Sequence, residues 1–490
     1  MTSADLLLRN ARLVRDGAPA DPVDMLISAG TIASIGSAEP DGAEVVDLDG
    51  RYLMNGLWDH HVHFQQWALS RQHLDLSCTT SAREVADRVR DRLATNPPPA
   101  GGALLGYGFR DGLWPDQPLK SLLDDVSGDV PVALASGDLH SGWLNSAAMR
   151  QLGAVDRPSG LLRETEFAPV MKLLATAPAV VGELVADAAR TAASRGVVGV
   201  VDLENARNTE VWSDRYAAGI DVLRVECSVY PENLDWAIEQ GLRSGDAVPE
   251  TGGLMTMGPL KVMTDGSLNT RTAYCHDPYP GMAEDAYGLL VVPPEVLVPL
   301  MQRAFDHGIT SAIHAIGDHA NRLALDAFEK VGCAGTIEHA QLLAPEDFPR
   351  FRELGVAASV QPVHALDDRD VADRHWAGRT GRAFAFGGLL AAGAELRLGS
   401  DAPVAPLDPW LSAAAAVHRS GDERESWHPE QEIPVGAALD ASTRGGRTPR
   451  AGAPADLVVL DADPMLAAID ELRAFPVHST LLAGRWTWRA

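Results

Sequence analysis

Short apolar segments alternate with helical stretches along the middle of the chain, and this alternation limits the possible folds more than any other sequence feature. Helices are predicted for stretches that end at a glycine, such as Glu183–Arg195, Pro294–His307 and His319–Val331. The segments that read as strands are Tyr52–His63, Val197–Leu203, Val222–Tyr230, Leu260–Thr264, Thr310–His314, Thr336–His339, Val356–Gln361 and Leu396–Leu398. Strands alternating with helices are typical of a parallel sheet covered by helices, and eight such strands close a TIM-type barrel. We therefore predict an α/β fold with a (β/α)8 barrel.

Both ends of the chain read as short strands separated by turns. These segments are Asp5–Val14, Asp24–Ile35, Glu44–Asp47, Ala455–Asp461 and Ser479–Trp488. Neither end is large enough to fold alone, so we expect residues 1–50 and 445–490 to combine into one small β-sandwich domain. The barrel then spans residues 51–444.

A long interval separates the first two predicted barrel strands. This stretch, about residues 64–180, contains a capping box that starts a helix at Ser81 with Glu84 at its third position. It also contains strand-like runs at Ala103–Phe109 and Val130–Ala135. We predict an insertion after barrel strand 1, on the C-terminal face of the barrel, where loops form active sites.

Composition excludes several classes of protein. The 490 residues carry a formal net charge of −26, which disfavours binding to nucleic acid and to anionic membranes. The charge serves solubility or, alternatively, favours cationic substrates. No apolar run is long enough to span a membrane, and Met1–Leu8 does not read as a secretion signal, so we expect a cytoplasmic protein. The 4 cysteines form no CxxC pair, which argues against a disulfide framework and against a thiolate zinc site.

The sequence Asp59-His60-His61-Val62-His63 closes the first predicted barrel strand. Residues two apart in a strand point to the same side, so His61 and His63 could hold one metal ion, and imidazole nitrogens suit zinc. The alternative is a pair of buried histidines satisfied by hydrogen bonds.

Further residues of the metal-ligand type stand at the ends of later predicted strands. His314 and His339 each end a strand, and Asp401 follows the eighth. Strand ends of a closed barrel converge on one mouth, so these side chains are expected to meet there. Lys261 lies among apolar neighbours on the fourth strand, where an unpaired charge is costly. Either it pairs with a carboxylate such as Asp265, or carbon dioxide carboxylates it into an anionic metal ligand.

This pattern resembles the binuclear amidohydrolases, and the flanking phrases resemble the YtcJ-like (amidohydrolase 3) branch of that superfamily. The similar phrases are Lys261-Val-Met-Thr-Asp-Gly-Ser267, Arg271-Thr-Ala, His314-Ala-Ile-Gly-Asp318, Glu338-His339-Ala-Gln, Gly399-Ser-Asp-Ala-Pro403, Asp138-Leu-His-Ser-Gly-Trp-Leu-Asn-Ser146 and Ala453-Pro-Ala-Asp-Leu-Val-Val-Leu460. The resemblance covers essentially the whole chain. Two departures are Asn55-Gly56, where the family usually has Pro-Gly, and His60, where it has a small residue.

The resemblance implies a set of metal ligands. They are His61, His63 and Asp401 on one ion, His314 and His339 on a second, and a carboxylated Lys261 that bridges the two. One or two zinc ions are expected, with iron or manganese as alternatives. His60 leaves open which imidazoles bind. We also expect Asp59 and Asp318 to orient the liganding imidazoles.

Asp401 is the predicted catalytic residue. A metal ion lowers the pKa of bound water to about 7, and Asp401 could then shuttle the proton from that water to the leaving amine. The alternative is that Asp401 is a ligand only.

Five residues are candidates for substrate binding: His140, Tyr107, Trp114, Trp143 and Arg271. For His140 the alternative is a helix cap, for the three aromatic residues simple packing, and for Arg271 a salt bridge.

The predicted function is hydrolysis of a carbon–nitrogen bond in a small molecule, such as an N-substituted formamide or an N-acyl amine. Two alternatives remain: hydrolysis of a cyclic amide or ester on the same centre, and a non-catalytic binding relative of the fold. A homodimer is expected only because symmetric dimers are common among soluble enzymes.

Overall fold

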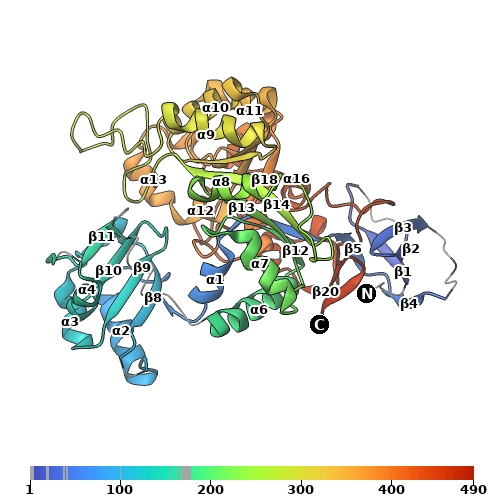
Figure 1. The fold of residues 1–490 in the computed structure, drawn as a ribbon, viewed down its shortest axis with the longest axis horizontal. Coiled ribbons are helices and arrows are strands. Elements are labelled where there is room, and N and C mark those ends of the chain that lie inside the picture. Colours follow the sequence, from blue (N-terminus) through green and yellow to red (C-terminus); the bar gives the residue numbers. More distant parts are fainter. Residues whose placement is uncertain are drawn as a thin grey trace.

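The computed structural model describes residues 5–17, 21–36, 39, 42–99, 101–154, 156–163, 166–167 and 178–490. A barrel lies at its centre, between a sheet of terminal strands and a second sheet inserted in the chain (Figure 1). The barrel strands, paired in parallel in sequence order, are β6 (Leu57–Val62), β12 (Val197–Asp202), β13 (Arg224–Val229), β14 (Met255–Met263), β15 (Ser311–Ala315), β16 (Gly335–His339), β17 (Val356–Val360) and β18 (Leu396–Leu398). The eight strands confirm the TIM-type barrel predicted from the alternation.

The barrel closes through the residues that follow β18. Val62 and Ala402 form a parallel bridge, Asp401 N donates to His61 O at 2.7 Å, and His63 N donates to Ala402 O at 2.8 Å. The two ends of the barrel sheet therefore meet at His61, His63 and Asp401.

Helices surround the barrel and include the three predicted from terminal glycines. They are α6 (Pro178–Ser194), α7 (Asn208–Ala217), α8 (Pro231–Glu239), α9 (Pro294–Asp306), α10 (Asp318–Val331), α11 (Phe348–Leu354), α12 (Pro362–Asp367), α13 (Arg369–His375), α14 (Phe386–Ala391), α15 (Pro409–Val417) and α16 (Val435–Ala441). The chain leaves α10 at Gly332, whose φ of 70° is the left-handed conformation that glycine adopts without steric cost.

The first predicted strand, Tyr52–His63, is wrong as a single element. The chain divides at Gly56 into β5 (Tyr52–Asn55), which pairs with terminal strands, and β6, which joins the barrel. Gly56 lies against Val198 of β12, so closely that a Cβ at Gly56 would sit 2.2 Å from Val198 Cγ1. A larger residue at this crossing between sheets would clash with Val198 unless one of the two moved.

Strands from both ends of the chain form one sheet. Its strands are β1 (Leu6–Leu13), β2 (Val23–Ser28), β3 (Thr31–Gly36), β4 (Glu44–Asp47), β5, β19 (Leu457–Leu460), β20 (Val477–Leu482) and β21 (Arg485–Arg489). β5 joins the two ends, because it pairs with β1 on one side and with β19 on the other. The sandwich arrangement and the domain boundaries stay predictions.

The predicted insertion contains a sheet of its own. Five strands follow the order β11-β10-β9-β8-β7, with β7 (Leu74–Asp75), β8 (Leu104–Phe109), β9 (Val132–Ser136), β10 (Ser141–Leu144) and β11 (Leu161–Arg163). The helices of this segment are α1 (Phe64–Ser70), α2 (Ala82–Thr95), α3 (Lys120–Ser127) and α4 (Ser146–Leu152). α2 starts where predicted, since Ser81 Oγ accepts from Glu84 N. Residues 168–177 of the predicted insertion lie outside the described residues.

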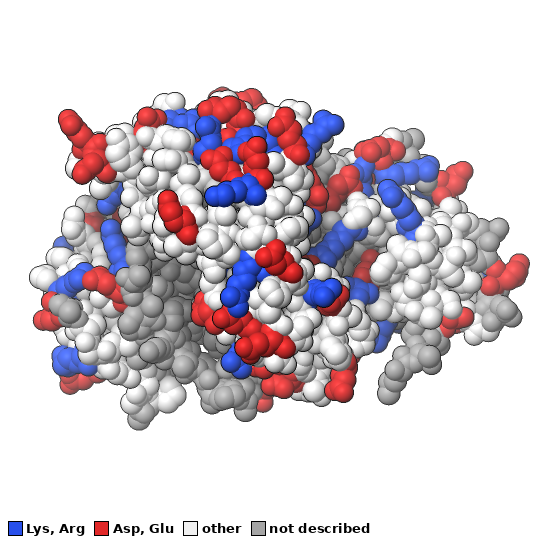
Figure 2. Space-filling view, turned by 45° about the horizontal axis from the view of Figure 1, so that its top comes forward, with Lys and Arg blue, Asp and Glu red and all other residues white. Residues whose placement is uncertain are grey.

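Ion pairs cover the outer surface of α10 and α11. Arg350 Nη2 lies 2.8 Å from Asp326 Oδ1, and Arg322 Nη2 lies 2.7 Å from Glu346 Oε1. Basic and acidic side chains are intermingled near the top of the face drawn in Figure 2. Exposed pairs of this kind contribute little stability each. Within the described part of the chain, the structure contains no helix long and apolar enough to cross a membrane.

Candidate metal centre

A cavity of about 240 Å³ opens at the C-terminal ends of the barrel strands. All six predicted metal ligands line it: His61, His63, Lys261, His314, His339 and Asp401. They come from β6, the residue after β6, β14, β15, β16 and the residues after β18. The barrel thus brings together side chains that are far apart in the sequence.

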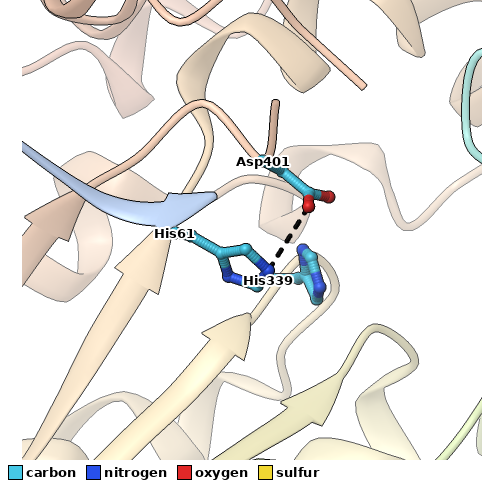
Figure 3. A group of neighbouring side chains, drawn as sticks. All are labelled: His61, His339 and Asp401. Atoms are coloured by element: carbon cyan, nitrogen blue, oxygen red, sulfur yellow. Dashed lines mark ion pairs between the residues drawn. The ribbon is translucent and has the colours of Figure 1, made fainter. Parts of the chain in front are cut away.

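The tightest cluster consists of His61, His339 and Asp401 (Figure 3). One nitrogen or oxygen of each lies within 4.8 Å of the others. His61 Nε2 is 3.3 Å and His63 Nε2 is 3.5 Å from Asp401 Oδ1. Two imidazoles and a carboxylate oxygen around one point are donors that zinc and similar divalent metals prefer.

Buried polar atoms without hydrogen-bond partners show that these residues fit a metal ion. Several such nitrogen atoms among the described residues are buried and form no hydrogen bond. They include His61 Nε2, Lys261 Nζ and both ring nitrogens of His314. Leaving such groups unpaired costs about 1–3 kcal/mol each. Burial also lowers the pKa of His61, His314 and His339 well below the ordinary value, so the rings stay neutral and keep a lone pair for a ligand bond.

Lys261 is buried on β14, and its amine does not pair with Asp265. The Asp265 carboxylate instead accepts from the backbone N–H groups of Tyr274, Ile316 and Gly317. Burial lowers the pKa of Lys261 and raises the pKa of Asp401. Of the two interpretations of Lys261, the contacts do not support the salt bridge.

The residues that orient the imidazoles are not the predicted ones. His61 Nδ1 lies 2.5 Å from Glu338 Oε2, and His339 Nδ1 lies 2.8 Å from Gln361 Oε1. A carboxylate only accepts hydrogen bonds, so Nδ1 of His61 carries the hydrogen and Nε2 faces the cavity. His314 Nε2 lies 3.4 Å from Asp265 Oδ1 but makes no hydrogen bond there, so both ring nitrogens of His314 lack such a partner.

The prediction that Asp59 and Asp318 orient imidazoles is wrong. Asp59 Oδ1 accepts from the backbone N–H groups of His61 and Ser400, so it fixes the closure of the barrel. Asp318 at the start of α10 pairs with Arg382 at 2.8 Å.

His60 points away from the cluster. It lines a separate cavity on the inside of the barrel together with Glu226 and Arg397, and its Nδ1 lies 3.0 Å from Leu398 O. Burial lowers its pKa to about 3. The imidazoles at the metal cavity are therefore those of positions 61 and 63, as the strand alternation indicated.

The structure places only one of the five substrate-binding candidates on the cavity, and that residue is His140. Trp143 is fully buried in the core of the inserted sheet, with its ring 6.2 Å from that of Trp114. Tyr107 OH lies 2.8 Å from Gly137 O and also contacts Pro403 O, so it joins the insertion to the barrel. Arg271 does not line the cavity, Trp114 and Trp143 pack in the core of the inserted sheet, and Tyr107 lines a neighbouring cavity.

Sequence reasoning missed several residues that line the cavity. They include Gln66, Arg110, Asp138, His364 and Asp368. His364 Nε2 lies 3.9 Å from Asp401 Oδ2. Its position just after the seventh strand was a usable signal, because ligands at the other strand ends occupy equivalent places. The remaining residues lie on the insertion and on surrounding loops, and only Asp138 belongs to a phrase that resembles the family.

An eight-stranded barrel with imidazoles and a carboxylate at its C-terminal mouth defines a metal-dependent hydrolase. A metal-dependent hydrolase from Pyrococcus horikoshii has the same fold, with a TM-score of 0.79 and 26% identity, over 95% of this chain and 99% of that one. The chain belongs to the amidohydrolase family, whose model matches residues 44–487.

Two relatives extend this similarity. The protein YtcJ of Bacillus subtilis is 28% identical, over 90% of this chain and 90% of its own length. The N-substituted formamide deformylase of Arthrobacter pascens is 27% identical, over 98% of this chain and 97% of its own length. The resemblance read from the motifs is thereby confirmed.

Proposed function

We propose that this hydrolase cleaves the carbon–nitrogen bond of a linear amide, such as an N-substituted formamide or an N-acyl amine. The observation that carries the proposal is the cluster of His61, His339 and Asp401, whose ligand atoms converge in the cavity. The similarity to an N-substituted formamide deformylase over nearly the whole chain supports the choice of substrate.

The metal in this proposal is zinc. His61, His63 and Asp401 would hold one ion, His314 and His339 would hold a second, and a carboxylated Lys261 would supply a further oxygen ligand. When bound, such ions lower the pKa of water and polarise a carbonyl oxygen. Glu338 and Gln361 keep the rings of His61 and His339 in the orientation that presents Nε2 to the cavity.

Asp401 moves the proton in the proposed reaction. Its Oδ1 lies beside His61 and His63, and its Oδ2 faces His364. From this position the carboxylate takes a proton from the attacking water and delivers it to the departing nitrogen. His140, on the insertion side of the cavity, binds the substrate.

Elemental analysis of protein purified without chelators tests the proposal. Wild type is expected to contain about two zinc ions per chain, and Lys261→Ala is expected to lose most of them. Lys330→Ala, an exposed lysine at the end of α10, is the matched control and is expected to keep the wild-type content.

The same preparations are assayed on aryl formamides and aryl esters with and without a chelator. Chelator-sensitive hydrolysis of the formamides supports the proposal. Cleavage of esters alone contradicts it, and an inactive protein without metal after zinc is supplied indicates a binding relative of the fold.

A further inference from the structure

A second and larger cavity adjoins the metal cavity. Its volume is about 700 Å³, and it lies where α1, β8, α12, α15 and the segment after Asp401 meet. The two cavities share Arg110 and Val404 in their walls. None of the metal ligands lines the second cavity.

The wall between the cavities is thin. Val404 N donates to Asp401 O at 2.8 Å, so a single turn of chain connects the carboxylate to this wall. Arg110 completes the wall, with Nη2 2.8 Å from Asp367 Oδ2 and 3.4 Å from Val404 O. The two cavities are therefore neighbours, separated at this point by Val404 and Arg110.

About half of the residues that line the second cavity are apolar, and apolar atoms form the larger part of its surface. Its apolar lining residues are Trp67, Val363, Leu366, Pro403, Ala405 and Leu411. Four of its charged residues form ion pairs: Arg71 pairs with Asp187 at 3.0 Å, Arg473 with Asp470 at 2.6 Å, and Arg110 with Asp367 at 2.8 Å, the last two both within the lining. A fifth, Asp75, accepts a hydrogen bond from Ser77 N. The chemistry of this lining fits an uncharged aliphatic or aromatic group.

We propose that the second cavity binds the apolar substituent carried by the leaving nitrogen of the substrate, an inference that rests on the proposed amide hydrolysis. In that reaction the oxygen of water bonds to the carbonyl carbon, the carbon–nitrogen bond breaks, and the nitrogen takes up a proton to leave as an amine. The donor of that proton must lie within hydrogen-bond reach of the nitrogen. Residues 403–405 follow Asp401 directly and form a wall of the second cavity. The substituent on the nitrogen beside Asp401 is therefore the part of the substrate that lies nearest to the second cavity.

The inference predicts a dependence on chain length. For N-alkyl formamides from methyl to octyl, kcat/KM of wild type is expected to rise by up to about fourfold per buried methylene. Ser70→Trp places a large ring in the cavity from the end of α1 and is expected to abolish this rise while N-methylformamide is cleaved at nearly the wild-type rate. Ser121→Trp on the exposed side of α3 is the matched control.

Leu366→Trp fills the same cavity from α12 and replaces Ser70→Trp in this test if Ser70→Trp does not fold. Equal loss of rate for short and long formamides in these variants, or no loss for either, overturns the inference.

Binding of octylamine, measured by calorimetry, separates this inference from the proposed function. Wild type is expected to bind octylamine at least tenfold more tightly than Ser70→Trp does, whether or not it hydrolyses amides. A wild type that binds octylamine but cleaves no amide refutes the proposed function and leaves the apolar site standing. Equal affinity of wild type and Ser70→Trp overturns the assignment of the cavity.

Discussion

At the scale of single residues, two members of the metal-binding cluster reach the cavity from an unusual backbone conformation. His339 has a φ of 75° and Asp401 a φ of 58°, in the left-handed region that residues with a side chain rarely occupy. Each such residue costs of order 1–3 kcal/mol, and the surrounding contacts must offset that cost. Asp401 is held by the hydrogen bond from its N–H to His61 O, so barrel closure and ligand placement depend on the same bond.

Asp401→Asn is expected to lower kcat by about 100- to 10,000-fold, because the amide cannot accept and return a proton. Most of the bound metal should remain, since the side chain keeps an oxygen and the other ligands are intact. Elemental analysis and amide turnover on one preparation measure both effects. Asp235→Asn, whose side chain is 70% exposed, is the control. Near-normal turnover in Asp401→Asn would rule out the shuttle role.

Glu338→Gln tests the residue that orients His61. The change keeps the shape of the side chain but removes the charge that accepts from His61 Nδ1, so metal affinity is expected to fall about 10- to 100-fold. Competition with a chelator of known affinity measures the loss. Glu329→Gln, with a side chain that is 64% exposed, should leave metal affinity unchanged. An unchanged affinity in Glu338→Gln would mean that the contact does not support the ligand.

Asp368, beside Arg110 in the cavity wall, is expected to make stability depend on pH. Burial raises its pKa to about 7, whereas an unfolded aspartate titrates near about 4. Between these values the folded chain binds a proton that the unfolded chain has lost, so the Asp368 contribution to stability falls as pH rises from about 4 to 7. Asp368→Asn should therefore gain about 1–3 °C in Tm over wild type at pH 8 and less at pH 5. A constant difference in Tm would contradict the assigned pKa.

The identity of the candidate metal ligands was the part of the site that the sequence predicted best. Ligand types at the strand ends, together with the family resemblance, indicated six candidate metal ligands, and all six line the cavity. Their hydrogen-bond partners were not predictable, because Glu338 directly precedes His339 and strand alternation predicts that it points away. In the structure Glu338 instead reaches His61 of β6, and because β6 and β16 are not neighbours in the barrel sheet, the two side chains meet across the barrel interior.

At the scale of elements, Gly56 marks where the chain passes from the terminal sheet into the barrel. Gly56→Ala is expected to destabilise the fold by about 1–3 kcal/mol, since the added Cβ would lie 2.2 Å from Val198 Cγ1. Val198→Ala in the same chain should recover much of the loss, and a double-mutant cycle of unfolding midpoints measures this coupling. Gly182→Ala in α6, where an added Cβ meets nothing within 4 Å, should be neutral or stabilising. Additive effects of the first two changes would contradict the close contact.

Strands were predicted well in the centre and less well at their ends. β14 begins at Met255, five residues before the predicted Leu260. The residues before Leu260 were not predicted as strand, because Gly258 and Pro259 are typical strand breakers. In the structure Gly258 packs against the backbone of Cys227 on β13, where a side chain would not fit. The division of the first strand at Gly56 depends likewise on Val198, a residue distant in sequence, and no local pattern reveals it.

At the scale of the whole molecule, the two ends of the chain stabilise each other. β19 pairs with β5 from Tyr52 to Asn55, and its residues Leu457 and Val459 share a buried cluster with Leu53. A chain that stops after residue 450 would expose the edge of β5 and this apolar cluster to solvent.

The truncated chain 1–450 is therefore expected to be insoluble when expressed alone and to become soluble when residues 451–490 are expressed as a separate fragment. Soluble yield and co-purification of the two pieces measure this. A soluble, folded chain 1–450 on its own would show that β5 does not need its partner. A chain shortened only by Ala490, the last residue, is the control.

The bridge between Val62 and Ala402 has a consequence for protein synthesis. A ribosome that has released His61 and His63 needs roughly 20–70 s more, at 5–20 residues per second, to release Asp401. During translation the nascent chain thus carries two imidazoles without the carboxylate that completes their cluster. Under the proposed mechanism, a chain that ends before Asp401 is expected to have no hydrolytic activity.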